Sequence, residues 1–198
     1  MNGKMGKTEQ PRIMFTQLQG FQAIDEQGKV KTILFLNAAR EIVSIIESFG
    51  KLFKPVVYDM NGNIDKLFKI YVQNEIDYMF LDDMLKSNED KVQICARDAL
   101  TWLKRALEMI EKFFSYVVAD KNCEENLKKH IEAAYAVTLK QYHSWLIQKS
   151  FSLIYTVLPN RSQLIGTGDV HRENVQALDQ FLESMRVHLS EVNLMICN

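Results

Sequence analysis

The sequence predicts an all-α fold of about six to eight helices, packed as two layers face to face. The 198 residues include only three prolines and eight glycines, so long helices can run without interruption. Apolar residues recur at helical spacing, and no segment alternates apolar and polar residues as a half-buried strand would. The length fits one domain with a large core.

Each expected helix is bounded by residues that start or end helices. In chain order the helices cover about 29–49, 55–73, 77–86, 90–118, 123–157 and 170–195. In the first, Ile42, Ile46 and Phe49 follow helical spacing, and Gly50 ends it. Pro55 opens the second at its first turn. The third is a short piece.

The later helices are bounded by capping residues and turns. Residues 87–90, Ser-Asn-Glu-Asp, offer caps for the fourth helix, and residues 120–122 form the loop after it. The fifth helix stops before Pro159, and Asp169 caps the last. Residues 1–12 are expected to form a flexible polar arm, which leaves 13–198 as the domain.

Composition argues against several classes of protein. A formal net charge of −1 gives no basic field for nucleic acid. Cys95, Cys123 and Cys197 are scattered without metal-ligand spacing, so we expect reduced thiols, no metal and a cytosolic location. No apolar run approaches the roughly 20 residues that span a bilayer. A permanent membrane anchor is therefore not expected.

Catalytic motifs are also missing from the sequence. It contains no Gly-x-Ser-x-Gly elbow, no His-Glu-x-x-His, no P-loop and no glycine-rich dinucleotide turn. Asp59 and His143 could form an acid–base pair, but a non-enzymatic role without a cofactor is favoured.

One helix face carries an unusual set of polar side chains. Asp59, Asn63 and Lys66 stand at i, i+4 and i+7, so a helix places them on one stripe, between apolar neighbours. Such a stripe is usually a solvated face. An acid, an amide and an ammonium in a row would also suit a neutral, hydroxyl-rich head group, because together they offer donors and acceptors with little net charge.

Two other segments place polar or aromatic groups where they could bind a ligand. Trp102 lies within the fourth helix, one turn after Asp98, and its flat face could stack on a sugar ring. His143 lies in an apolar stripe, where a neutral imidazole could donate a hydrogen bond to an amide carbonyl. A single tryptophan or histidine in such a place is more often part of the core. The combination along one chain favours binding.

In these segments the chain resembles the glycolipid transfer protein family. The resemblance rests on VVYDMNGNIDKLFKIY, ALTWLKRALEMIEKFF and AAYAVTLKQYHSWLIQKSF, together with ILFLNAAREIVSIIESFG, in the same order and at similar separation. It covers about residues 24–195. It implies the two-layer all-helical sandwich of that family, with about eight helices, an apolar pocket between the layers and intermembrane transfer of glycosphingolipids.

The resemblance also implies roles for particular residues. Asp59, Asn63 and Lys66 match the family's head-group panel, Trp102 matches the residue that stacks on the sugar, and His143 matches the one that holds the ceramide amide. Asp98 is a secondary head-group residue. Expected pocket-lining residues are Phe49, Phe53, Val56, Leu139 and Phe151. Trp145 matches an aromatic that touches the membrane, and Tyr142, Lys149 and Tyr155 are expected beside it.

The resemblance leaves alternatives open. Family members that carry ceramide-1-phosphate place cations where this chain has Asp98 and Trp102, and a phosphate would be repelled by Asp98. A glycosphingolipid carrier is therefore favoured over a phosphate carrier. It is expected to meet membranes transiently and to work as a monomer. A glycolipid sensor or scaffold with a protein partner stays possible. A helical interaction module without a ligand would leave Asp59, Asn63, Trp102 and His143 far apart.

Overall fold

The computed structural model describes residues 10–25 and 27–197, which form eight α-helices joined by loops and four short 3₁₀ turns. The helices are α1 (Thr32–Ser48), α2 (Lys54–Tyr71), α3 (Leu81–Leu85), α4 (Asp90–Ala119), α5 (Lys128–Val137), α6 (Trp145–Ile154), α7 (Arg161–Ile165) and α8 (Gly168–Cys197). Across these residues the sole extended pairing is an isolated bridge between Lys31 and Phe80. The all-α prediction with about eight helices is confirmed.

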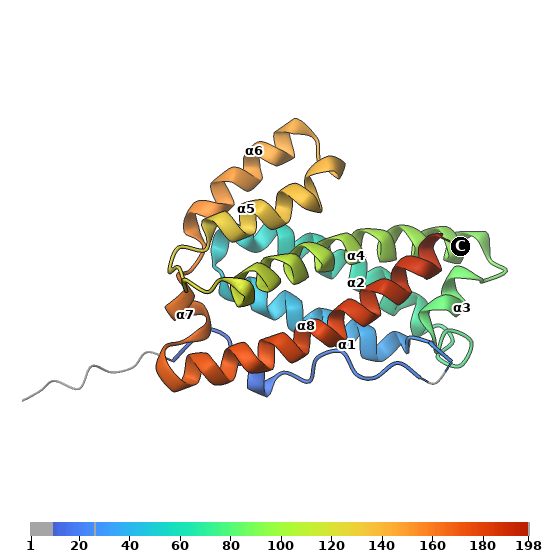
Figure 1. Cartoon of the computed structure of the whole chain (residues 1–198). Helices are drawn as coiled ribbons and strands as arrows, with labels where there is room; N and C mark the ends of the chain where they lie inside the picture. The colour runs from blue at the N-terminus through green and yellow to red at the C-terminus, as the bar shows by residue number, and fades with distance from the viewer. Residues whose placement is uncertain (1–9, 26, 198) are drawn as a thin grey trace, which may run out of the picture.

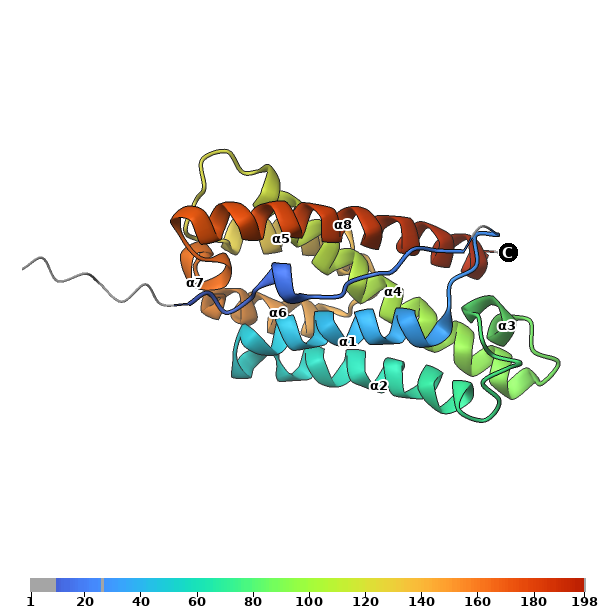
Figure 2. The ribbon, with the colours of Figure 1, turned by 90° about the horizontal axis from the view of Figure 1, so that it is seen from below.

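The helices pack in layers around α4. Helices α2 and α4 lie between α1 and α8 on one side and the α5–α6 pair on the other (Figure 1). From below, the N-terminal segment runs between α1 and α8 (Figure 2). The aromatic core lies where these layers meet, and it includes Phe15, Phe49, Phe113 and Phe114. This arrangement leaves α5 and α6 projecting from the main body.

Local chemistry explains how α1 and α2 are joined. Helix α1 ends before Gly50, whose φ of 121° is a left-handed value that favours glycine. Pro55 occupies the first turn of α2, where its missing N–H costs nothing. Both boundaries agree with the sequence prediction to within a few residues.

The predicted helix over 123–157 is wrong, because the structure breaks it into α5 and α6. At the break Thr138 leaves the helical region, and its hydroxyl donates to the carbonyl of Ala134 at 2.7 Å. The amide of Gln148 donates to the carbonyls of Lys140 and His143 at 3.1 and 2.9 Å, which satisfies backbone groups freed by the break. No proline or glycine marks this position.

Other boundaries also differ from the prediction. The short helix predicted over 77–86 begins only at Leu81, because the backbone N–H of Phe80 donates to Asp83 and fixes the start there. Helix α7 was not predicted; Asn160 caps it, with Gln163 bonding back to the N–H of Asn160. Most of the predicted arm, residues 1–9, lies outside the described residues, while Arg12 is bonded through its N–H to the carbonyl of Gln163.

Two buried polar residues hold the loops against the helices. Asn174 of α8 donates to the carbonyls of Ile13 and Ile165 and accepts from the N–H of Phe15. Arg161, which is 3% exposed, donates to the carbonyl of Val117 and to the carboxylate of Asp120.

Within the described ranges, none of the helices is both long and apolar enough to cross a membrane.

Candidate functional site

A cavity of about 650 Å³ lies between α2, α4 and the α5–α6 pair. Its size falls in the range of small-molecule sites. The residues that line it are Pro55, Val56, Asp59, Met60, Asn63, Lys66, Asp98, Trp102, Ala106, Leu139, Tyr142, His143, Ile147, Ser150, Phe151 and Ile154. Asp59, Asn63, Trp102 and His143, which are far apart in sequence, therefore meet at one cavity.

Helix α2 contributes the polar panel expected from the sequence. Asn63 is buried, and its amide donates to the carbonyl of Asp59 at 3.0 Å, while Lys66 Nζ lies 3.5 Å from Asn63 Oδ1. The carboxylate of Asp59 and the ammonium of Lys66 remain exposed at the cavity. Asn63 is thus held by hydrogen bonds within α2, whereas the charged ends of Asp59 and Lys66 stay accessible from the cavity.

Helix α4 faces that panel with a second stripe. Asp98, Trp102 and Ala106 recur every four residues, and all three line the cavity. Asp98 Oδ2 lies 3.7 Å from Lys66 Nζ, so the two helices are linked by an ion pair across the opening. Trp102 is half-buried, and the guanidinium of Arg105 lies 4.8 Å from its ring centre.

The connector between α5 and α6 brings His143 to the cavity. His143 has an extended backbone conformation just after a 3₁₀ turn, so the break in the predicted helix is what positions it. Its Nδ1 lies 3.0 Å from the hydroxyl of Tyr135, and its ring packs 5.3 Å from that of Phe151. Tyr135, Phe151 and Tyr155 form an aromatic cluster beneath it.

Partial exclusion of water shifts the pKa of two groups in the site, Asp59 and His143. Desolvation raises the pKa of Asp59, and the nearby charges of Lys66 and His143 oppose the rise. Desolvation lowers the pKa of His143, against the attraction of Asp59, so the imidazole is neutral at pH 7. Together the lining side chains offer hydrogen-bond donors and acceptors.

The inner wall of the cavity is apolar. Val56, Leu139 and Phe151, expected as lining residues, do line it. Phe49 and Phe53 do not: they are 2% and 3% exposed and pack against each other at 5.1 Å, within the core. Their expected place in the lining is therefore corrected, because the Phe49 ring packs against Phe113 of α4 and the Phe53 ring packs against Phe49.

Helix α6 exposes a face of large apolar side chains. Trp145, Leu146 and Leu153 are each about two-thirds exposed, and Lys149 Nζ lies 4.0 Å from the Trp145 ring centre. Tyr142 is also exposed at the cavity edge, stacked with Arg105 at 3.6 Å.

Tyr155 differs from the expectation of an interfacial residue. It is 5% exposed, and its hydroxyl has no hydrogen-bond partner among the described residues. Burial raises its pKa. It belongs to the aromatic cluster rather than to the exposed face of α6, because the chain turns into the 3₁₀ conformation at the end of that helix.

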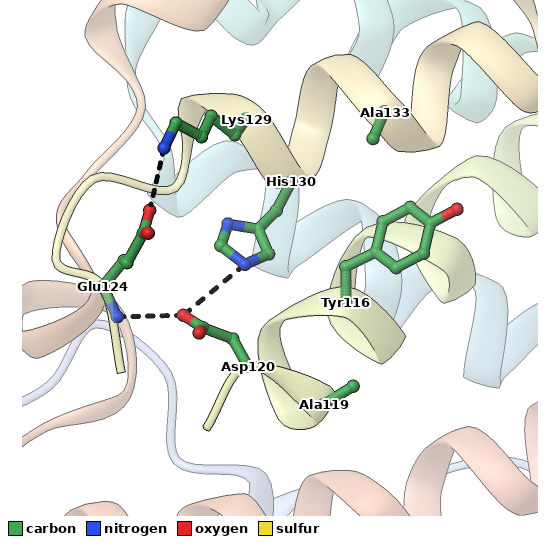
Figure 3. A pocket seen from close by; sticks show the side chains of 7 residues that line it. All are labelled: Tyr116, Ala119, Asp120, Glu124, Lys129, His130 and Ala133. Atoms are coloured by element: carbon green, nitrogen blue, oxygen red, sulfur yellow. Dashed lines mark hydrogen bonds and ion pairs between the residues drawn. The ribbon is translucent and has the colours of Figure 1, made fainter. Parts of the chain in front are cut away.

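A second hollow, of about 330 Å³, lies where the end of α4 meets the start of α5 (Figure 3). Its polar side chains bind one another. The carboxylate of Asp120 lies 3.5 Å from His130 Nε2 and accepts from the N–H of Glu124, whose own carboxylate lies 3.6 Å from Lys129 Nζ. This hollow shares no lining residue with the larger cavity.

Sequence reasoning missed several residues of the site. Met60 follows Val56 by one turn on the same face of α2, so its place in the lining could have been read from the spacing. Arg105, three residues after Trp102, could also have been paired with it. Nothing in the sequence linked Tyr135 to His143, because that contact depends on the unpredicted break between α5 and α6.

Comparison with known proteins points to one family. Residues 30–168 match the family model described as glycolipid transfer protein (GLTP). Among curated relatives, human pleckstrin homology domain-containing family A member 8 is 28% identical over 167 residues, which cover 81% of this chain but only 32% of the relative. The glycolipid transfer protein of Xenopus tropicalis is 24% identical over 189 residues, which cover 88% of this chain and 90% of that protein.

Solved structures of the same fold superpose on the chain. HET-C2, a fungal glycolipid transfer protein, is 30% identical with a TM-score of 0.70, over 89% of this chain and 93% of that one. FAPP2, described as selecting simple glycosphingolipids using the GLTP-fold, has a TM-score of 0.81 at 24% identity, over 92% and 93% of the two chains. Mouse ceramide-1-phosphate transfer protein has a TM-score of 0.78 at 16% identity, over 93% and 92%. At the last two identities the likeness concerns the fold.

Proposed function

The chain belongs to the glycolipid transfer protein family, whose members transfer lipids rather than catalyse reactions, and we propose that it moves glycosphingolipids between membranes. The observation that carries the proposal is the meeting of Asp59, Asn63, Trp102 and His143 at the mouth of one cavity with an apolar inner wall. An amphiphile with a polar head and two chains matches both parts.

The polar rim suits a sugar. Hydroxyl groups need both donors and acceptors, which Asp59, Asn63 and Lys66 offer from one stripe of α2. Trp102 lines the cavity and would stack its flat ring on the sugar. His143 would donate to the ceramide amide carbonyl.

The charge of the rim argues against a phosphate. The charged lining residues are Asp59, Lys66 and Asp98, so the formal charge at pH 7 is −1 with His143 neutral. The one lysine in this lining is already paired with Asp98 at 3.7 Å. A phosphate would meet two carboxylates and a lysine that is already paired, while Arg105 beside the lining is held against the Trp102 and Tyr142 rings; a neutral sugar has no charge to be repelled.

The lipid chains would enter between α6 and α2 and be buried at the apolar wall. Each buried CH₂ is worth roughly 0.8 kcal/mol, so a pocket that hides many of them allows the lipid to cross water. Trp145 and Lys149 on the exposed face of α6 would touch the bilayer transiently, with the ring at the interface and the ammonium beside the head groups. We expect a monomer to suffice.

Vesicle-to-vesicle transfer tests the proposal. Fluorescent galactosylceramide or ceramide-1-phosphate in phosphatidylcholine donors is mixed with unlabelled acceptors and purified protein. We expect rapid transfer of galactosylceramide and much slower transfer of ceramide-1-phosphate. The reverse preference would support a phosphate carrier, while binding of galactosylceramide without transfer would support a sensor.

A further inference from the structure

We propose that Tyr135 is a positioning residue for ligand binding: its hydroxyl donates to His143 Nδ1 and thereby holds the imidazole proton on Nε2. The expected effect on lipid transfer rests on the proposed function, whereas the hydrogen bond and the position of the proton concern the protein without lipid. It assigns a role to a buried tyrosine that itself does not line the cavity.

The direction of the hydrogen bond follows from the surroundings of the phenol. Tyr135 is 5% exposed, and the His143 ring is the one hydrogen-bond partner of its hydroxyl among the described residues, at 3.0 Å from Nδ1. If Nδ1 carried the proton and donated, the phenolic hydrogen would have no acceptor among the described residues. A donor without a partner costs more free energy than an unused lone pair, so the phenol donates and Nδ1 accepts.

The protonation states agree with this direction. Burial raises the pKa of Tyr135, so its phenol keeps its proton at neutral pH. Burial lowers the pKa of His143, so its ring carries a single proton there. With Nδ1 accepting, that proton resides on Nε2, and His143 can only donate at this nitrogen.

The surrounding contacts hold this pair in place. The Tyr135 ring stacks on Phe151 at 4.6 Å with an interplanar angle of 11°, and His143 packs on the same phenylalanine. Gln148 binds the carbonyl of His143 at 2.9 Å and so fixes the backbone of the connector. The imidazole is therefore oriented before any ligand arrives, which reduces the ordering cost of binding.

A consequence for specificity follows. A fixed Nε2–H requires a hydrogen-bond acceptor in the ligand at this point, as the carbonyl of an N-acylated sphingoid base provides. A ligand without an acceptor at this point would leave the Nε2–H of His143 without a hydrogen-bond partner. Tyr135 thus helps to select amide-linked lipids without touching them.

The experiment compares Tyr135→Phe with Tyr155→Phe as the matched control. Both tyrosines are 5% exposed and belong to the same aromatic cluster, but the Tyr155 hydroxyl has no partner among the described residues. Imidazole ¹⁵N NMR of the lipid-free protein should show the proton of His143 on Nε2 and Nδ1 accepting a hydrogen bond. Tyr135→Phe should remove the accepting signature at Nδ1, and Tyr155→Phe should retain it.

Transfer of N-palmitoyl galactosylceramide between phosphatidylcholine vesicles tests the consequence. Tyr135→Phe should transfer about five-fold more slowly, the worth of one neutral hydrogen bond, with Tyr155→Phe close to wild type. In a His143→Ala background Tyr135→Phe should have no further effect, as expected for a residue that acts through the histidine.

Three results would overturn the inference: a proton on Nδ1 in the wild-type protein, an unchanged Nδ1 signature in Tyr135→Phe, or equal losses from Tyr135→Phe with and without His143. The NMR result on wild-type protein does not depend on how either variant folds. If wild-type protein transfers no glycolipid while the Nε2 proton is observed, the proposed function fails and the tautomer assignment stands.

Discussion

Reversing the charge of the cavity rim should change which head group the protein prefers. The perturbation is Asp98→Arg together with Trp102→Arg, which changes the formal charge of the lining from −1 to +2. It also releases Lys66 from its ion pair with Asp98, where the two side chains are 49% and 57% exposed. Three cations would then face one acid, Asp59, while the stacking face for a sugar is lost.

The expected magnitude follows from the exposure of these groups. A unit charge pair at 4 Å is worth about 1 kcal/mol in water, and exposed pairs contribute at most about that much. Two new cations near a phosphate should therefore add about 2 kcal/mol in favour of ceramide-1-phosphate, or roughly 30-fold in relative transfer over galactosylceramide. Competition between the two labelled lipids in one vesicle population measures this ratio.

A matched control separates local charge from net charge. Asp65→Arg reverses a charge on α2 at an exposed position that does not line the cavity, and it should leave the ratio unchanged. If the double variant keeps the wild-type preference, or if Asp65→Arg shifts it as much, the electrostatic account of head-group choice is wrong.

Three other perturbations give separate outcomes. Trp102→Ala should slow galactosylceramide transfer at least ten-fold, whereas Trp102→Phe, which keeps a flat ring, should retain most of it; equal losses in the vesicle assay would exclude stacking. Arg161→Ala should lower the free energy of unfolding by about 3–5 kcal/mol in urea titrations, because the carbonyl and carboxylate that this residue binds lose their partner. A loss below about 1 kcal/mol would contradict that role. Burial lowers the pKa of His143 and His188, so both favour folding above about pH 6.5 and lose this contribution as the pH falls through their folded-state pKa values. Urea titrations between pH 8 and 5 should show that decline, and His188→Asn should flatten it; an equal slope in the variant would exclude His188 as a source.

Much of the fold could be predicted because the long helices have clear periodicity and marked ends. Gly50 and Pro55 bound α1 and α2 by backbone chemistry that any sequence reading can recognise. The break between α5 and α6 could not be predicted in this way. It depends on side chains that satisfy the freed backbone, above all Gln148, and such bonds are visible only once the chain has turned.

The site, too, could be predicted only where it depends on a single helix. The stripe of Asp59, Asn63 and Lys66 is a property of one helix, so spacing alone placed it on a face. The pairing of that face with α4, and the arrival of His143 from the connector, depend on tertiary packing. Phe49 and Tyr155 were misplaced for the same reason, since residue type does not tell which of two apolar environments a ring enters.

The central claim is that a neutral, sugar-bearing ceramide is the ligand of the cavity between α2, α4 and the α5–α6 pair. Transfer by the wild-type protein, with galactosylceramide and ceramide-1-phosphate competing in the same donor vesicles, tests it most directly. The account predicts that galactosylceramide reaches the acceptors at least ten-fold faster. Faster arrival of ceramide-1-phosphate, or no protein-dependent transfer of galactosylceramide, would contradict it.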